Sequence, residues 1–113
     1  MKRIALAILS LAVAVTFLAV PNSYSAESTL AKIKKRGVLV AGVKFDFPPM
    51  GFINKKTGKP DGFDVDLVNE IAKKLGVKTK FVQALSKTRI PLIVNGNVDL
   101  IAATMTHKRS RDK

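Results

Sequence analysis

Residues 97–111 read NVDLIAATMTHKRSR and pass from an apolar strand signal into a polar, basic loop. Val98 and Leu100 belong to a short apolar run, and the Asn-Gly-Asn sequence before it is typical of a turn. Thr104 and Thr106 are separated by one residue, so their hydroxyls point the same way in an extended backbone. The pattern predicts a buried strand whose carboxyl end carries polar side chains.

Arg111 adds a guanidinium to this loop, five residues after Thr106. Arginine binds a planar carboxylate through two parallel hydrogen bonds. Strand ends in open α/β sheets are also common ligand sites. The residues therefore favour a carboxylate site, although a strand followed by a solvated basic loop explains them as well.

The preceding chain alternates between helix and strand signals. Ser28 can cap a helix that runs to Arg36, and the apolar run Val38–Val43 fits a strand buried on both faces. Another strand is expected over Val77–Val82, where apolar and polar residues alternate. A helix is expected over residues 64–75, with an apolar face formed by Leu67, Val68, Ile71, Ala72 and Leu75.

Three shorter segments connect these elements. Two prolines prevent residues 44–50 from continuing the first strand, residues 51–54 fit a short edge strand, and residues 55–62 fit a turn. A short helix that ends at Val94, capped by Ser86 or Thr88, comes before the opening segment. The alternation predicts a three-layer α/β/α unit with a parallel core.

The N-terminus has the layout of a secretory signal peptide, with a basic start, an apolar run over residues 4–20 and small residues before Ala26. We expect residues 1–25 to be removed, with cleavage after Ser25 or Ala26, and residues 26–113 to form the exported domain. An uncleaved membrane anchor is the alternative, because the apolar run is near the lower length limit for a span.

The formal net charge is +12, and removal of Lys2 and Arg3 with the leader lowers it by two, to +10. Such a surplus suits nucleic acid or an anionic membrane. Export argues against nucleic acid, and the lysines are scattered rather than gathered in one stripe with aromatics. The chain has no cysteine and one histidine, His107, so we predict no metal site and no cofactor.

Several motifs are more specific together than apart: GFDVDL at residues 62–67, RIPL at 89–92, GNVDL at 96–100, and TMT at 104–106 with Arg111. They resemble the N-terminal part of the extracytoplasmic substrate-binding proteins of polar amino-acid ABC importers. The resemblance implies a periplasmic binding protein-like type II α/β fold, of which this chain is an incomplete first lobe. It implies a periplasmic, non-enzymatic protein that binds an amino acid, closes by a hinge and docks on a membrane permease.

The resemblance also implies roles for the opening segment. Arg111 would bind the ligand α-carboxylate, helped by the hydroxyl and N–H of Thr106. Thr104 would contact the α-ammonium, often through its carbonyl. Arg109 is the alternative for the carboxylate role, because the basic run allows a shifted register.

Five residues upstream complete the expected site. Phe47 and Phe63 match aromatic walls of the ligand pocket, with ordinary core as the alternative. Lys44, Ser86 and Arg89 resemble the subset that recognises aspartate or glutamate, whose second carboxylate needs its own partner. The alternative is a solvated Lys44 and an Arg89 that braces its loop.

Relatives of this kind continue beyond residue 113 into a second lobe that carries the acidic partner of the ligand ammonium. One wall encloses less of a ligand than the ~70–90% typical of good sites, so we expect the chain alone to fold marginally and bind weakly. The alternatives are a dehydratase-like enzyme or a receptor sensor domain on the same fold, a polyanion binder with steep salt dependence, and a non-functional fragment.

Overall fold

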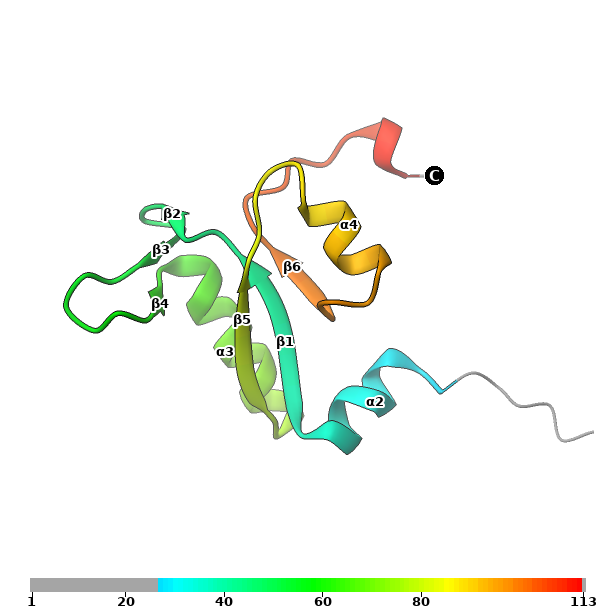
Figure 1. Ribbon diagram of the computed structural model, residues 1–113. Helices are drawn as coiled ribbons and strands as arrows, with labels where there is room; N and C mark the ends of the chain where they lie inside the picture. Colours follow the sequence, from blue (N-terminus) through cyan, green and yellow to red (C-terminus); the bar gives the residue numbers. More distant parts are fainter. Residues whose placement is uncertain (1–26, 113) are drawn as a thin grey trace, which may run out of the picture.

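The computed structural model describes residues 27–112, so the predicted signal peptide lies outside the described part of the chain. Its centre is a parallel sheet in the order β5-β1-β6, formed by Lys78–Gln83, Val38–Val43 and Leu100–Ala102. In the pairing register, Val43 of β1 lies opposite Gln83 of β5 and Ala102 of β6. The three strands therefore end at the same level, which confirms the predicted parallel core (Figure 1).

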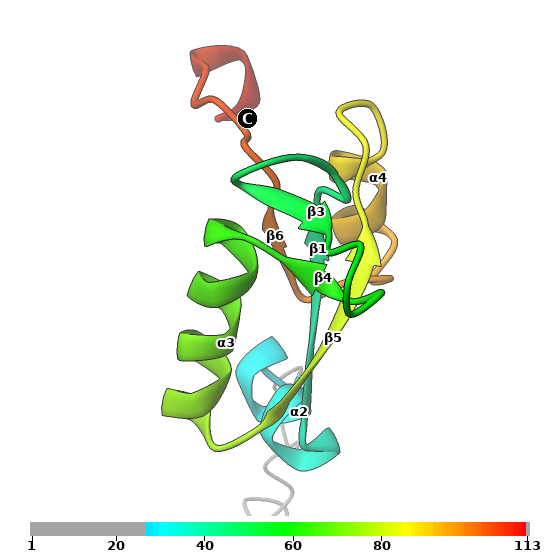
Figure 2. The ribbon, with the colours of Figure 1, turned by 90° about the vertical axis from the view of Figure 1, so that its left-hand side faces the viewer.

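Helices cover both faces of this sheet. Figure 2 shows α3 (Phe63–Leu75) on one side and α4 (Arg89–Val94) on the other. The first described helix, α2 (Thr29–Arg36), precedes β1. The Ser28 hydroxyl caps it by accepting from the Ala31 N–H at 3.2 Å, as the sequence predicts. The α/β/α layering is thus confirmed.

The main core lies between β1 and α3. Alternate residues of β1 and an i, i+3, i+7 set on α3 form one buried cluster with Ile33 of α2: Leu39, Ala41, Val43, Val65, Val68 and Ala72. The predicted face of α3 is wrong at Leu67, which is 47% exposed, whereas Asp64 and Val65 are buried. The helix begins at Phe63, and its buried stripe runs through residues 64, 65, 68 and 72, which leaves Leu67 beside the stripe.

A second, antiparallel sheet precedes α3 in the order β2-β3-β4, formed by Asp46–Phe47, Gly51–Ile53 and Pro60–Asp61. Residues 51–54 were expected to form an edge strand, but β3 is the middle strand of this sheet. The expected turn over residues 55–62 contains β4, because the Lys55–Lys59 connection folds the chain back onto β3.

After β6 the chain runs through a segment without regular structure, in which Thr104 has a positive φ of 53°, into the short 3-10 turn η2 (Arg109–Arg111). Figure 1 shows this segment leaving the carboxyl end of β6, beyond the main sheet. Among the described helices, none combines the length and the apolar character needed to cross a bilayer.

Candidate functional site

The carboxyl ends of β5, β1 and β6 form one edge of the main sheet, and the predicted site residues follow these ends. Lys44 is the first residue after β1, and Ala84 is the first after β5. Ala103 and Thr104 follow β6. Because parallel strands deliver their carboxyl ends to one edge, side chains far apart in sequence meet there.

Lys44 joins the loop after β5 to the small sheet. Its Nζ donates to the Ser86 Oγ at 3.2 Å and lies 5.8 Å from the centre of the Phe47 ring. An ammonium over an aromatic face is attracted by the negative face of the ring. The structure thus brings three predicted site residues together at this edge.

Gly62 places the start of α3 against the loop that carries Pro49 and Met50. The Phe63 N–H donates to the Pro49 carbonyl at 3.1 Å, and the Asp64 N–H donates to the Met50 carbonyl at 2.8 Å. A Cβ at Gly62 would lie 2.6 Å from the Met50 oxygen, and φ there is 117°, so glycine is required. This close approach fixes the position of the first turn of α3, which carries Phe63 and Asp64.

The chain is also held just before Gly62. Asp61 accepts from the Asn54 side-chain amide and from the Gly62 N–H, each at 2.8 Å. Both hydrogen bonds hold the pKa of Asp61 below its ordinary value, and the bond from Asn54 has the larger effect.

Phe47 and Phe63 do not pack as ordinary core. Phe47 is 50% exposed and Phe63 is 62% exposed. The role of these two rings as walls of a ligand pocket stays a prediction.

Arg89 is buried at the start of α4, with 8% of its surface exposed. Its Nε donates to the Ser86 carbonyl at 3.3 Å, and its Nη1 donates to the Ala103 carbonyl at 2.8 Å. These two hydrogen bonds fit the alternative in which Arg89 braces its loop. A direct contact of Arg89 with ligand stays a prediction.

Thr106 and Arg111 contact each other in the segment after β6. The Arg111 guanidinium donates to the Thr106 carbonyl, and both side chains are exposed. For Arg109, the rival for the carboxylate role, no such contact to Thr106 is found in residues 27–112. The carboxylate role of Arg111 stays a prediction. The Nε2 of the exposed His107 lies 3.0 Å from an Asp112 carboxylate oxygen.

Sequence reasoning missed Asp64. This residue is only 6% exposed, and its Oδ2 has no hydrogen-bond partner. Burial raises the pKa of Asp64, and a hydrogen bond from the Thr104 N–H opposes that shift. The available signal was periodicity, because Asp64 lies four residues before the buried Val68 and eight before the buried Ala72.

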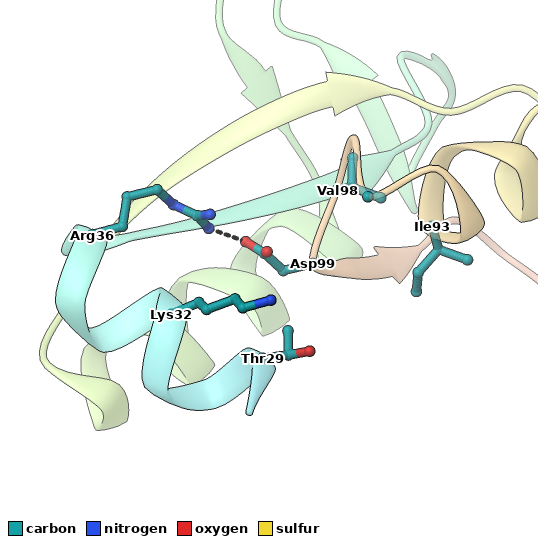
Figure 3. A pocket seen from close by; sticks show the side chains of 7 residues that line it. Thr29, Lys32, Arg36, Ile93, Val98 and Asp99 are labelled. Carbon is teal, nitrogen blue, oxygen red and sulfur yellow. Dashed lines mark hydrogen bonds and ion pairs between the residues drawn. The ribbon is translucent and has the colours of Figure 1, made fainter. Parts of the chain in front are cut away.

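A cavity of about 460 Å³ lies elsewhere, between α2, the end of α4 and the segment that leads into β6 (Figure 3). Asp99 there accepts from the Arg36 guanidinium and, at 2.9 Å, from the Val40 N–H. These contacts join α2, β1 and the start of β6, so the polar groups of this cavity already serve the fold. Within residues 27–112 there is no cluster of three or more residues that could hold a metal ion.

The fold and the polar edge are those of a solute-binding lobe, and the chain belongs to the bacterial extracellular solute-binding proteins, family 3, whose model matches residues 39–113. A glutamine-binding protein from Geobacillus stearothermophilus is 48% identical over 76% of this chain and 34% of its own length. An L-glutamate/L-aspartate-binding protein from Pseudomonas aeruginosa is 33% identical over 98% of this chain and 39% of its own.

A solved structure supports the fold. The arginine-bound form of domain 1 from TmArgBP, the ArgBP of T. maritima, is 41% identical over 71% of this chain and 63% of that one, with a TM-score of 0.67. The predicted type II first-lobe fold is therefore confirmed.

The relatives differ from this chain in length and from one another in activity. The chain spans about a third of the length of the curated relatives it matches. A membrane-bound lytic murein transglycosylase from Vibrio cholerae also matches, at 38% identity over 77% of this chain and 16% of its own length. Proteins named for ligand binding and a protein named as an enzyme therefore both match this chain.

Proposed function

We propose that residues 26–113 form the N-terminal part of the first lobe of an amino-acid-binding protein, exported to the periplasm after removal of residues 1–25. The observation that carries this proposal is the edge itself. A cation, a hydroxyl and an exposed aromatic ring gather where three parallel strands end, and none of the three is buried: Lys44, Ser86 and Phe47. A second exposed ring, Phe63, stands at the start of α3. In this proposal the whole protein delivers its ligand to an ABC permease.

The ligand is an α-amino acid held at two ends. Arg111 and Thr106 take the α-carboxylate, and the Thr104 carbonyl takes the α-ammonium. The Arg111 guanidinium already lies against Thr106 without any carboxylate partner in residues 27–112. A ligand carboxylate offers the anionic acceptor that this guanidinium lacks.

The side chain of the ligand is acidic, with glutamate and aspartate favoured. Lys44 supplies a full positive charge beside the Ser86 hydroxyl, which suits a second carboxylate. The P. aeruginosa relative, whose name gives these two ligands, agrees with this choice. Glutamine is the second candidate, because a carboxamide can accept from the same groups and the G. stearothermophilus relative is named for glutamine.

Calorimetry on the purified chain tests the proposal. L-glutamate should bind more tightly than L-glutamine, and both should bind weakly because one lobe leaves the ligand half open. The control ligand is 4-aminobutyrate, which keeps the side-chain carboxylate of glutamate but lacks the α-carboxylate. Equal binding of all three compounds, or of none, would overturn the proposal. Incubation with each compound should leave it chemically unchanged, whereas any product would favour the enzyme alternative.

A further inference from the structure

The edge of the main sheet opposite the candidate site carries a dense group of positive charges. At this edge α2 ends just before β1 begins, and α3 ends just before β5 begins. Figures 1 and 2 both show these two junctions at the bottom of the molecule, away from the segment that follows β6. We call this the basic edge, and its cations come from the last turns of α2 and α3 and from the start of β5: Lys34, Lys35, Arg36, Lys73, Lys74 and Lys78.

The pairing of β1 with β5 gathers these cations from three elements. Val38 at the start of β1 lies opposite Lys78 at the start of β5, and the Lys78 N–H donates to the Gly37 carbonyl at 3.0 Å. Gly37 is the C-cap of α2, and Gly76 is the C-cap of α3. Because paired strands lie about 4.8 Å apart, the last turns of both helices are brought to the same end of one strand pair.

Little negative charge offsets the basic edge, and all six cations are exposed. Asp99 accepts from Arg36, and a Glu70 carboxylate oxygen lies 4.0 Å from the Lys73 Nζ. Among residues 27–112, no carboxylate lies within 4.0 Å of the other four: Lys34, Lys35, Lys74 and Lys78. Cations in the last turn of a helix stabilise it through the helix dipole, but a lysine in β5 has no such role. The edge therefore holds more positive charge than the fold uses.

An anionic phospholipid surface is the partner that these charges fit. Clusters of about four to eight Lys or Arg residues next to a membrane bind anionic lipids. The apolar run of the expected leader ends shortly before α2, so export places the basic edge next to the bilayer. Residues 34–38 and 73–78 contain no aromatic side chain on which a nucleic-acid base could stack.

We propose that the basic edge binds the surface of an anionic phospholipid membrane, with the lipid phosphate groups as its ligands. In this orientation the carboxyl ends of β5, β1 and β6 point away from the bilayer, so the candidate amino-acid site stays open to solvent. The attraction comes from summed charge and is screened by salt. The proposal goes beyond amino-acid binding and does not depend on it.

Vesicle co-sedimentation with the exported chain, residues 26–113, tests the proposal. One set of vesicles contains phosphatidylglycerol and phosphatidylcholine in equal parts, and the other contains phosphatidylcholine alone. The wild-type chain should bind the anionic vesicles far more tightly than the neutral ones, and this binding should fall as salt increases. Equal binding to both sets, or binding to neither at low salt, would overturn the proposal.

Paired substitutions assign the binding to the basic edge. Lys74→Gln combined with Lys78→Gln should weaken binding to the anionic vesicles ~25-fold, since each lysine near such a surface contributes about fivefold in affinity. The matched control combines Lys55→Gln with Lys56→Gln, in the connection between β3 and β4, and removes the same charge. This control should lose much less affinity. Equal losses in the two double variants would mean that only net charge matters and would overturn the assignment to this edge.

Inorganic phosphate distinguishes a membrane surface from a site for a small anion. At constant ionic strength, phosphate should not displace the wild-type chain from anionic vesicles, because one phosphate meets only a few of the six cations. Saturable displacement by phosphate would identify a small-anion site and would overturn the membrane assignment.

The orientation on the membrane gives an independent test. In anionic bicelles that carry a spin-labelled lipid, the amide signals of Gly37, Gly76 and Lys78 should broaden more than those of Thr104 and Thr106. The opposite order would place the carboxyl ends of the strands on the membrane and would overturn the proposal. Failure of the chain to bind any amino acid would contradict the proposed function and would leave these membrane results unchanged.

Discussion

The Nζ of Lys44 lies 3.2 Å from the Oγ of Ser86, so a cation after β1 and a hydroxyl after β5 share a hydrogen bond across the end of the sheet. The two residues are 42 positions apart in sequence. They meet because the parallel strands β1 and β5 end side by side. We expect the side chain of the ligand to bind at this pair.

Lys44→Met should reduce the preference for L-glutamate over L-glutamine. The pair is open to solvent, so the selective loss should not exceed about 1 kcal/mol, or about fivefold. Calorimetry at low and high salt measures the loss, which should shrink as salt screens the charge. Lys56→Met, in the exposed Lys55–Lys59 connection, is the control and should leave the preference intact. Equal weakening of both ligands by Lys44→Met would remove the acidic assignment and leave amino-acid binding in place.

Asp64 should make stability depend on pH. Burial raises its pKa above the ordinary 3.8, so the folded state binds a proton more tightly than the unfolded state does. This residue therefore lowers the free energy of unfolding as pH rises from its ordinary pKa through its raised one. Asp64→Asn should be more stable than wild type at neutral pH, and the gain should vanish in acid. Urea unfolding from neutral pH to below the ordinary pKa checks the sign. A constant difference between the two proteins across that range would contradict the account.

Gly62→Ala should destabilise the chain by more than about 1–3 kcal/mol, the usual range for one strained backbone conformation. The new methyl group would also approach the Met50 carbonyl oxygen at 2.6 Å. Gly58→Ala is the comparison, because the φ of Gly58 is 67°, in the left-handed region that other residues can adopt, and the space around its Cβ is open. Urea unfolding should show a clearly smaller loss for Gly58→Ala. Equal losses would mean that neither the backbone conformation at Gly62 nor its contact with the Met50 loop adds a cost beyond that of an ordinary left-handed glycine.

Asp99→Ala should lower the free energy of unfolding by about 1–3 kcal/mol, since it removes an acceptor from both the Arg36 guanidinium and the Val40 N–H. Arg36→Met should have a smaller effect, because the Arg36 side chain is 45% exposed and the Val40 bond survives. A double-mutant cycle by urea unfolding isolates the pair. Ligand affinity should not change in either variant, because this contact lies away from the carboxyl edge. A change in affinity would point to the Asp99 cavity as part of the site.

Local sequence signals predicted most of the main sheet and its helices. Ser28 and Gly37 bound α2, and the β-branched run of β1 reads as a strand buried on both faces. Cap residues and continuous apolar runs act over a few residues, so a sequence displays them directly.

The small sheet and the burial of Asp64 and Arg89 were not predictable in the same way. β4 is two residues long, and its pairing with β3 depends on where the Lys55–Lys59 connection directs the chain. The burial of Asp64 depends on how α3 is rotated against β1, and the inward turn of Arg89 depends on the Ala103 carbonyl being within reach. Motif resemblance singled out Lys44, Phe47, Phe63 and Ser86 at the edge, but it could not say that Arg89 faces the backbone.

The most direct test of the account locates the bound amino acid on the chain. A titration of the ¹⁵N-labelled chain with L-glutamate, followed by amide chemical shifts, reports every site at once. We predict saturable shifts at Lys44, Thr104, Thr106 and Arg111, with weaker binding in Arg111→Met and an unchanged response in Arg109→Met. No saturable shift at these residues, or shifts confined to Thr29, Lys32 and Ile93 at the opposite cavity, would contradict it.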